Sequence, residues 1–239
     1  MQNLLYLCLL SLFSLFACGN NAPDSEPVPF GDDAIEVPLR YLALGDSYTI
    51  GESVAETQRW PVLLTDDLRR EGFDIAAPRI IARTGWTTKN LQNGIDDADI
   101  DNETFDIVSL LIGVNNQFQG RSLEEYKTQF AELLQQAVDF AAGDKTRVFV
   151  VSIPDYAFTP FGQNSGNAET ISAEIDVFNA AAREITETEE IPFYNITPIS
   201  RQGNDDPELV AGDGLHPSGK QYQLWVDSFV AEVAELLRD

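Results

Sequence analysis

The chain has 239 residues, of which 44% are hydrophobic and 23% charged, a composition typical of a globular protein and too apolar for a disordered one. Asp and Glu number 39 against 15 Lys and Arg, which gives a net charge of −24. Because nucleic-acid and anionic-lipid binding both depend on cationic side chains, this excess argues against a nucleic-acid partner and against membrane docking through a basic patch.

The first residues are typical of a secretion signal. Residues 4–17 carry no charge and no proline, and the stretch is shorter than the ~20 residues that span a bilayer, so we expect residues 1–17 to be a signal peptide. The stretch ends at Ala17-Cys18-Gly19, which resembles a bacterial lipobox. In such a motif Cys18 would carry lipid and begin the mature protein. A plain signal peptide or an uncleaved anchor is the alternative.

The following segment, residues 18–38, is rich in proline and acidic residues and contains no basic residue. Proline and charge repulsion both extend a chain, so we expect a solvated tether that holds a folded domain, residues 39–239, off a membrane. The predicted location is the bacterial cell envelope, or the exterior if no lipid is attached. Because Cys8 and Cys18 are the only cysteines, the domain itself has no thiol for catalysis or metal binding.

From residue 39 onward, short apolar runs alternate with longer amphipathic stretches. The apolar runs predict strands at residues 41–44, 78–82, 105–112, 147–153 and 192–196. The clearest helix patterns cover residues 123–142, with Ser122 as N-cap, and residues 218–238. Continuous apolar runs suit strands that are covered on both faces, and the alternation with helices predicts a parallel sheet between two helical layers. In such sheets the reactive site lies at the carboxyl ends of the strands.

Polar segments occur where these strands end. They are residues 45–51, 84–88 and 113–116, together with residues 213–219 before the last helix. Because a hydroxyl is a weak nucleophile without an adjacent base, and imidazole is the base suited to neutral pH, Ser47 would need His216, the only histidine. Asp213 lies three residues earlier, close enough in a tight turn to accept the second ring proton.

These segments resemble the blocks of the SGNH, or GDSL, hydrolase superfamily: GDS at 45–47, Gly85, GVNN at 113–116 and DGLHPSG at 213–219. The resemblance implies a flavodoxin-like three-layer α/β/α sandwich with a five-stranded parallel sheet, and hydrolysis of acyl esters or thioesters through a serine acyl-enzyme. It implies that Ser47 is the nucleophile, His216 the base and Asp213 its acidic partner.

The resemblance also implies three oxyanion donors, namely the backbone N–H groups of Ser47 and Gly85 and the side-chain amide of Asn115. One departure is visible, because the third block of the superfamily is usually G-x-N-D and this chain has Asn116 in the last position. Since Asn115 carries the donor role, the departure concerns the support of the loop more than catalysis.

The substrate is predicted less directly. The connection from Asp155 to Ser172 is long for a βα loop and leaves the sheet at the same edge as the polar segments, so its Tyr156, Phe158 and Phe161 are candidate substrate-binding residues. An exposed loop whose aromatic side chains cover the core is the alternative. After Asn115, a second candidate wall is formed by Gln117, Phe118, Gln119 and Arg121.

We therefore expect a carboxylic ester hydrolase for a short acyl group, with a carbohydrate ester among the candidates. A lysophospholipase or acyl-thioesterase is the alternative enzyme, and the Trp60–Leu64 stretch, WPVLL, resembles that branch. An alternative of another class is a non-catalytic glycan-binding module. The expected partners are a small ester and, through a lipid anchor only, a membrane.

We expect no cofactor and no metal. Asp97, Asp99, Asp101 and Glu103 alternate as in a calcium loop, but the required glycine and the twelfth-position glutamate are missing. A solvated acidic turn is the favoured interpretation.

Overall fold

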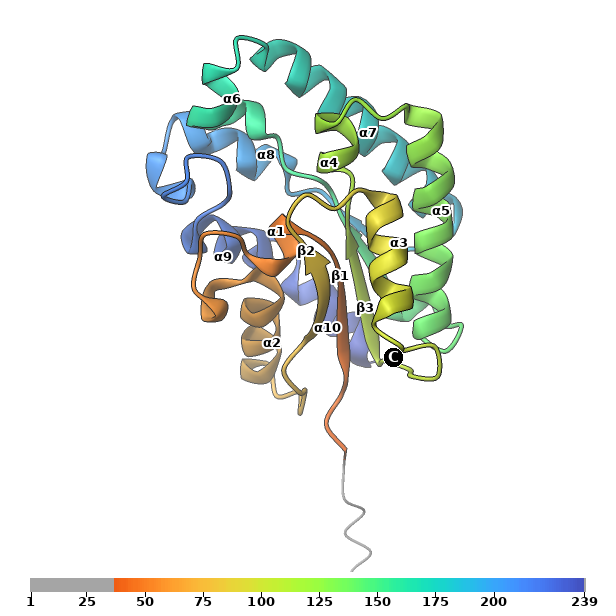
Figure 1. Cartoon of the computed structure of the whole chain (residues 1–239). Helices are drawn as coiled ribbons and strands as arrows, with labels where there is room; N and C mark the ends of the chain where they lie inside the picture. The colour runs from red at the N-terminus through yellow and green to blue at the C-terminus, as the bar shows by residue number, and fades with distance from the viewer. Residues whose placement is uncertain (1–36, 239) are drawn as a thin grey trace, which may run out of the picture. The chain divides into compact units, whose positions relative to one another are not determined.

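Five parallel strands form the central layer of the structure, a computed structural model that describes residues 37–238 (Figure 1). Their order in the sheet is β2-β1-β3-β4-β5, the flavodoxin-like arrangement, in which the chain reverses direction across the sheet between β1 and β3. The strands are β1 (Tyr41–Asp46), β2 (Arg79–Arg83), β3 (Ile107–Leu111), β4 (Val148–Val151) and β5 (Phe193–Tyr194).

Helices cover both faces of this sheet, because its central strands are apolar on both sides. Every residue of β1, β3 and β4 is buried. One face is covered by α3, α5 and α7, and the other by α2, α9 and α10 (Figure 1). The helices are α1 (Ser47–Ile50), α2 (Trp60–Arg70), α3 (Thr88–Asp97), α4 (Val114–Phe118), α5 (Leu123–Phe140), α6 (Pro160–Asn164), α7 (Ala168–Thr188), α8 (Thr197–Ser200), α9 (Gly219–Asp227) and α10 (Val230–Arg238). The predicted three-layer sandwich is confirmed.

The five predicted strands all form, with small differences at their ends. One difference is at β5, which stops at Tyr194 although the sequence pattern extends to Ile196. The reason is a side chain from the end of β4. The Ser152 hydroxyl oxygen accepts the N–H of Ile196 at 2.9 Å and that of Thr197 at 3.2 Å. These donors are therefore unavailable to a strand ladder, and the chain turns into α8.

The single helix predicted for residues 218–238 is in fact two helices, α9 and α10. The Ser228 hydroxyl donates to the Trp225 carbonyl at 2.7 Å, the acceptor that a continuous helix would offer to the N–H of Phe229. That N–H instead bonds the Val226 carbonyl at 3.1 Å. The tightened turn directs the Phe229 ring into the core, where it packs edge-on against Trp60 at 6.2 Å.

The connection after β4 was predicted to be a long loop, and it contains helical turns instead. A 3₁₀ turn covers Tyr156–Phe158, α6 follows, and α7 already begins at Ala168. Side chains start both turns: Asp155 accepts the N–H of Ala157 at 3.0 Å, and Thr159 accepts that of Gly162 at 3.2 Å. The segment is therefore ordered by its own caps and has little free loop.

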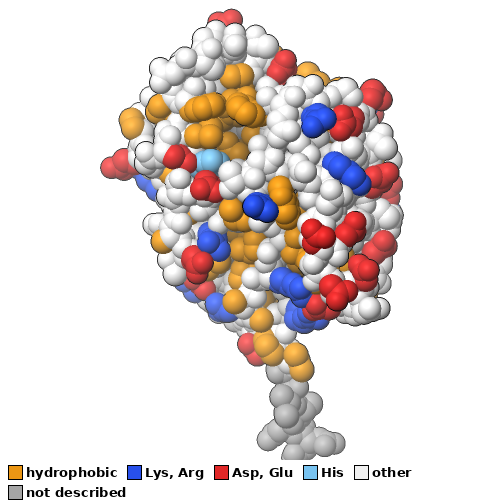
Figure 2. All heavy atoms as spheres, in the orientation of Figure 1, with side chains coloured by type: hydrophobic (Ala, Val, Ile, Leu, Met, Phe, Trp, Pro, Cys, Tyr) orange, Lys and Arg blue, Asp and Glu red, His pale blue; other side chains and the backbone are white. Residues whose placement is uncertain are grey.

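The predicted signal peptide, Cys18 and all but the last residues of the predicted tether lie outside the described residues. Among the helices within residues 37–238, none combines the length and apolarity that crossing a membrane requires. Acidic side chains are scattered over the visible face, and hydrophobic ones gather beside the histidine (Figure 2).

Candidate active site

Ser47 lies where β1 turns directly into α1. Two neighbours make this sharp turn possible. A Cβ atom on Gly45 would lie 2.6 Å from the Leu111 carbonyl oxygen, so only glycine fits there. The Asp46 carboxylate caps α1 by accepting the N–H of Tyr48 at 3.0 Å. As a result, Ser47 is the first residue of α1, at the carboxyl edge of the sheet, and it is only 3% exposed.

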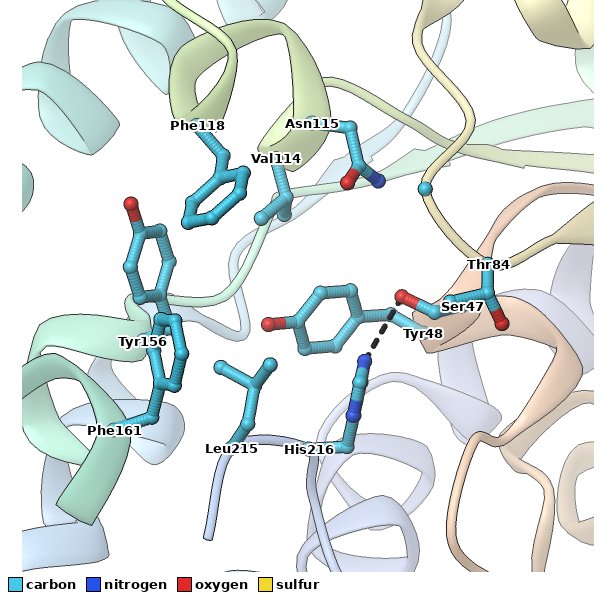
Figure 3. Close-up of a pocket in the computed structure, with 11 residues that line it drawn as sticks. Ser47, Tyr48, Thr84, Val114, Asn115, Phe118, Tyr156, Phe161, Leu215 and His216 are labelled. Carbon is cyan, nitrogen blue, oxygen red and sulfur yellow. Dashed lines mark hydrogen bonds between the residues drawn. The ribbon is translucent and has the colours of Figure 1, made fainter. Parts of the chain in front are cut away.

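The loop before α9 brings His216 and Asp213 to this hydroxyl. His216 Nε2 lies 3.0 Å from Ser47 Oγ (Figure 3). On the other side of the ring, His216 Nδ1 lies 2.7 Å from Asp213 Oδ2. The imidazole is buried and packs against the Tyr48 ring at 5.0 Å. With the carboxylate holding one ring nitrogen, the other is oriented to take a proton from the hydroxyl.

Asp213 is held by donors from three directions. Its Oδ1 accepts the backbone N–H groups of Leu215 at 2.9 Å and His216 at 3.0 Å, and its Oδ2 also accepts the Ser53 hydroxyl at 2.7 Å. Partial burial by itself would raise the pKa of the Asp213 carboxyl, but the hydrogen bonds from Ser53, His216 and the backbone outweigh it and hold the pKa well below its ordinary value. Asp213 is therefore an anion that can stabilise an imidazolium.

Sequence reasoning missed Ser53. Its backbone is in the left-handed region, with φ of 64°, where a residue other than glycine, Asn or Asp is uncommon and costs energy. Nothing in its sequence neighbourhood indicates the contact, because its partner Asp213 lies 160 positions away. Only the fold places the two loops together.

The predicted oxyanion residues Gly85 and Asn115 line the same pocket as Ser47. Gly85 has φ of +80°, and Gln119 donates to its carbonyl at 3.1 Å. The Asn115 amide points toward Ser47 (Figure 3), and its Nδ2 donates to Asp46 Oδ2 at 3.2 Å. An amide nitrogen carries two hydrogens, so one donor of Asn115 remains for a ligand.

Asp46 connects this donor to the turn that carries Ser47. Its side chain is fully buried, and burial raises the pKa of the Asp46 carboxyl to about 7, against the opposing effect of hydrogen bonds from Tyr48 and Asn115. One carboxyl group therefore caps the helix that presents Ser47 and orients the Asn115 amide.

Asn116 replaces the usual aspartate of the third block, and the structure shows what it does. It is fully buried, accepts the Thr88 N–H at 3.0 Å and donates to the Thr88 hydroxyl at 2.7 Å. The amide thus joins the start of α4 to the start of α3. The start of α4, which carries Asn115, is therefore held in place although Asn116 departs from the superfamily pattern.

A pocket of about 230 Å³ opens beside Ser47 and His216. Of the three predicted aromatic residues, Tyr156 and Phe161 line it (Figure 3). Phe158 does not belong to this lining. The 3₁₀ turn directs its ring toward the Arg201 guanidinium, 5.9 Å away, so we do not retain it as a substrate-binding residue. The pocket also contains residues that were not proposed from the sequence, namely Tyr48, Thr84, Val114 and Leu215.

The predicted second wall is only partly present. Phe118 lines the pocket, whereas Gln117 is buried and accepts the Tyr156 hydroxyl at 2.8 Å. Gln119 supports Gly85 instead, and Arg121 is exposed and does not line the pocket. The four candidates separate in this way because α4, which ends at Phe118, presents only one side to the cavity, and Gln119 and Arg121 lie beyond its end.

Within residues 37–238, no group of three or more His, Cys, Asp and Glu side chains is arranged to hold a metal ion. Of the acidic residues that alternate like a calcium loop, Glu103 forms ion pairs with Arg40 and Arg79. These pairs hold the pKa of Glu103 below its ordinary value.

Comparison with known proteins agrees with this geometry. The GDSL-like lipase/acylhydrolase family matches residues 43–224. A curated arylesterase from Vibrio mimicus is 24% identical over 202 residues, which cover 83% of this chain and 90% of that protein.

Similar solved structures include TesA, with a TM-score of 0.65 and 18% identity over 82% of this chain and 99% of that one. They also include Axe2, an acetylxylan esterase from Geobacillus stearothermophilus, with a TM-score of 0.61 and 17% identity over 82% and 94%. These two likenesses concern the fold. The family match spans most of the domain, so the chain belongs to the GDSL-like lipase/acylhydrolase family and is a carboxylic ester hydrolase.

Proposed function

We propose that the protein hydrolyses carboxylic esters through an acyl-enzyme formed on Ser47. The observation that carries this proposal is the series Asp213–His216–Ser47, joined at 2.7 and 3.0 Å at the mouth of a pocket. His216 Nε2 takes the proton of Ser47 Oγ as the oxygen attacks the ester carbonyl carbon. The C–O bond to the alcohol then breaks, and His216 returns the proton to the departing alcohol oxygen.

The second half of the reaction uses the same groups. His216 takes a proton from water, the hydroxyl oxygen attacks the acyl carbon, and the bond to Ser47 Oγ breaks as that oxygen regains a proton. The acid is released and the free enzyme is restored. In both halves the negative oxygen would be bound by the N–H groups of Ser47 and Gly85 and by the second N–H of the Asn115 amide. The support is that all three residues line the pocket, and that Asn115 and Gly85 are each held by a hydrogen bond.

For the substrate we retain an ester of a short acyl group, with a carbohydrate ester among the candidates for the alcohol side. A lysophospholipase or acyl-thioesterase would use the same groups, but a cavity of about 230 Å³ lies below the ~300–1,000 Å³ of sites that hold drug-sized ligands, which disfavours a long chain. A glycan-binding module without activity would have no need of an aligned serine, imidazole and carboxylate.

Turnover of p-nitrophenyl acetate tests the mechanism. Ser47→Ala should fold normally and lose nearly all activity, with a residual rate of up to about 10³–10⁴ over water from the oxyanion donors. Thr188→Ala, which removes an exposed hydroxyl at the end of α7 that does not line the pocket, is the matched control and should keep full activity. Wild-type activity in Ser47→Ala would contradict the proposed mechanism.

We also propose that Cys18 is lipidated and anchors the domain in the cell envelope. The support is the lipobox-like sequence before it and the acidic, proline-rich segment after it. The full-length protein expressed in a bacterium should then fractionate with membranes, and Cys18→Ser should release or mislocalise it. A mature protein whose first residue lies beyond Cys18 would contradict this placement.

A further inference from the structure

One half of the pocket beside Ser47 is built from aromatic side chains. Phe118, Tyr156 and Phe161 form a triangle with ring centroids 6.1 to 6.3 Å apart. Phe118 is 57% exposed and Phe161 42%, and among residues 37–238 no other aromatic side chain is comparably exposed. Figure 2 shows the resulting hydrophobic patch directly beside the single histidine. Exposed aromatic residues that adjoin a reactive site indicate an apolar ligand.

The Tyr156 side of the aromatic wall is held in place by hydrogen bonds and an ion pair. The Tyr156 hydroxyl donates to Gln117 at 2.8 Å, and Gln117 in turn donates to Glu174 of α7 at 2.6 Å. Behind the turn that carries Tyr156, the buried Asp155 pairs with Arg201 at 2.9 Å. A wall that is already ordered costs a ligand little to bind.

The lining excludes charged groups. No Asp, Glu, Lys or Arg side chain lines the cavity. A carboxylate or ammonium placed against its aromatic half would therefore lose water without gaining an ion-pair partner. The net charge of −24 further repels anions at long range. The group that fills this space is therefore uncharged.

The volume of the pocket limits the size of the group that it can bind. An apolar cavity of about 150 Å³ holds a benzene molecule, and this pocket has about 230 Å³. It therefore has room for one aromatic ring with a short extension, or for a flexible chain of about six to eight carbons. An acetyl group would leave most of the aromatic wall without contact.

Resting on the acyl-enzyme mechanism proposed above, we infer that the pocket binds the acyl side of the substrate. Preferred substrates are esters of uncharged apolar acids of about six to eight carbons or of arylacetic size, and Phe118 and Phe161 set the preference. The alcohol must reach His216 for its proton and then leave, whereas the acyl group stays on Ser47 until water attacks. A partly enclosed apolar space suits the group that stays.

The test is a series of p-nitrophenyl esters from acetate to dodecanoate, with phenylacetate added, measured on the wild-type protein, Phe118→Ala, Phe161→Ala and Leu224→Ala. Leu224 is an exposed apolar residue of α9 that does not line the pocket, so its variant is the matched control. For the wild type, kcat/KM should peak at hexanoate or octanoate. Each Phe→Ala change should lower kcat/KM for these esters by about tenfold, as expected when a pocket loses apolar contact, and leave acetate within about threefold.

A second arm keeps the acyl group as acetate and varies the alcohol from methyl to octyl. The aromatic variants should change kcat/KM by a similar factor, within about threefold, for every member of this series and leave the order of preference among the alcohols the same. A wild-type optimum at acetate, or variants that alter only the alcohol series, would overturn the inference while Ser47→Ala remained inactive. If Ser47→Ala retained activity, the acyl-enzyme mechanism itself would fail, which is a distinguishable result.

Discussion

The two halves of the pocket are held in different ways. The polar half consists of side chains fixed by hydrogen bonds of 2.7 to 3.2 Å: Ser47 to His216, His216 to Asp213, and Asn115 to Asp46. In the aromatic half only Tyr156 has a hydrogen bond, to Gln117 at 2.8 Å, whereas Phe118 and Phe161 are held by packing because their rings have no polar atom. Geometry set by hydrogen bonds serves bond making, which requires atoms in fixed positions. A packed apolar wall serves discrimination, which depends on shape and size.

From this contrast we expect variants of the two halves to differ in their kinetics. Changes in the polar half should lower kcat for every ester by a similar factor, because they weaken the transition state common to all substrates. Changes in the aromatic half should instead alter which ester is preferred.

The largest effect is expected at Asp213. Asp213→Asn should reduce kcat by about 10⁴-fold for every acyl length, because the imidazole loses both the acceptor that orients it and the charge that stabilises its cation. Steady-state kinetics across the acyl series checks this. A loss confined to long or to short acyl groups would show that Asp213 acts on specificity instead of on the reaction.

The next largest loss of kcat is expected for Asn115→Ala. Loss of one donor aimed at the developing negative charge should cost about 10²–10³ in kcat, with KM nearly unchanged. Phe118→Ala, three positions along the same helix, is the natural comparison, since it should change acyl preference instead. A change in KM alone for Asn115→Ala would contradict the donor role.

A smaller effect is expected at Ser53, which donates to Asp213 from a left-handed backbone. Ser53→Ala and Ser53→Gly both remove the hydroxyl, and each should lower kcat by about tenfold with KM unchanged, the rate equivalent of one hydrogen bond to a charged group. Ser53→Gly should be the more stable of the two, because glycine adopts this conformation without strain. If Ser53→Gly retained full activity while Ser53→Ala lost it, the backbone conformation would matter and the hydroxyl would not.

The smallest expected effect is on the free energy of unfolding and its dependence on pH. The pKa of the buried Asp46 is raised from 3.8 to about 7, so between these values the folded state binds a proton that the unfolded state has released. The free energy of unfolding contributed by this group therefore falls as pH rises and levels off above about pH 7.

Urea unfolding measures this contribution. From pH 5 to pH 8 the wild type should lose about 2–3 kcal/mol relative to Asp46→Asn, which cannot ionise at this position. Parallel stability curves for the two proteins over this range would show that Asp46 keeps an ordinary pKa. Asp213 has the opposite pH dependence. Because its pKa is lowered in the folded state, it contributes to the free energy of unfolding at neutral pH, and this contribution is lost only in strong acid.

The same contrast explains what the sequence could predict. Ser47 lies directly after a buried strand, where topology dictates its position at the edge of the parallel sheet, and Asp213 and His216 lie in a short polar segment before the last helix, so these three residues could be proposed in advance. The roles of Gly85 and Asn115 followed from the resemblance to the superfamily. The strands themselves were visible as apolar runs. The fold class and the enzyme class were confirmed.

Contacts that depend on side-chain direction could not be predicted. Phe158 and Tyr156 are two residues apart, yet the 3₁₀ turn sends only Tyr156 into the pocket. Ser53 is joined to its partner by the fold alone. The division of the last helix depends on one hydroxyl, that of Ser228, which competes for a backbone carbonyl. Such local competition leaves no periodic signal in the sequence.

The central claim is that Ser47 is the nucleophile that carries the acyl group. The most direct test is to treat the wild-type protein with a p-nitrophenyl alkylphosphonate. This reagent transfers its phosphonyl group irreversibly to the oxygen of an activated serine, and p-nitrophenolate leaves. The adduct is then located by peptide mass spectrometry. One equivalent bound to Ser47, with matching loss of esterase activity and no labelling of Asp213→Asn on the same timescale, is the expected result. Full inactivation with the adduct on another residue, or esterase activity that persists with Ser47 fully labelled, would contradict the claim.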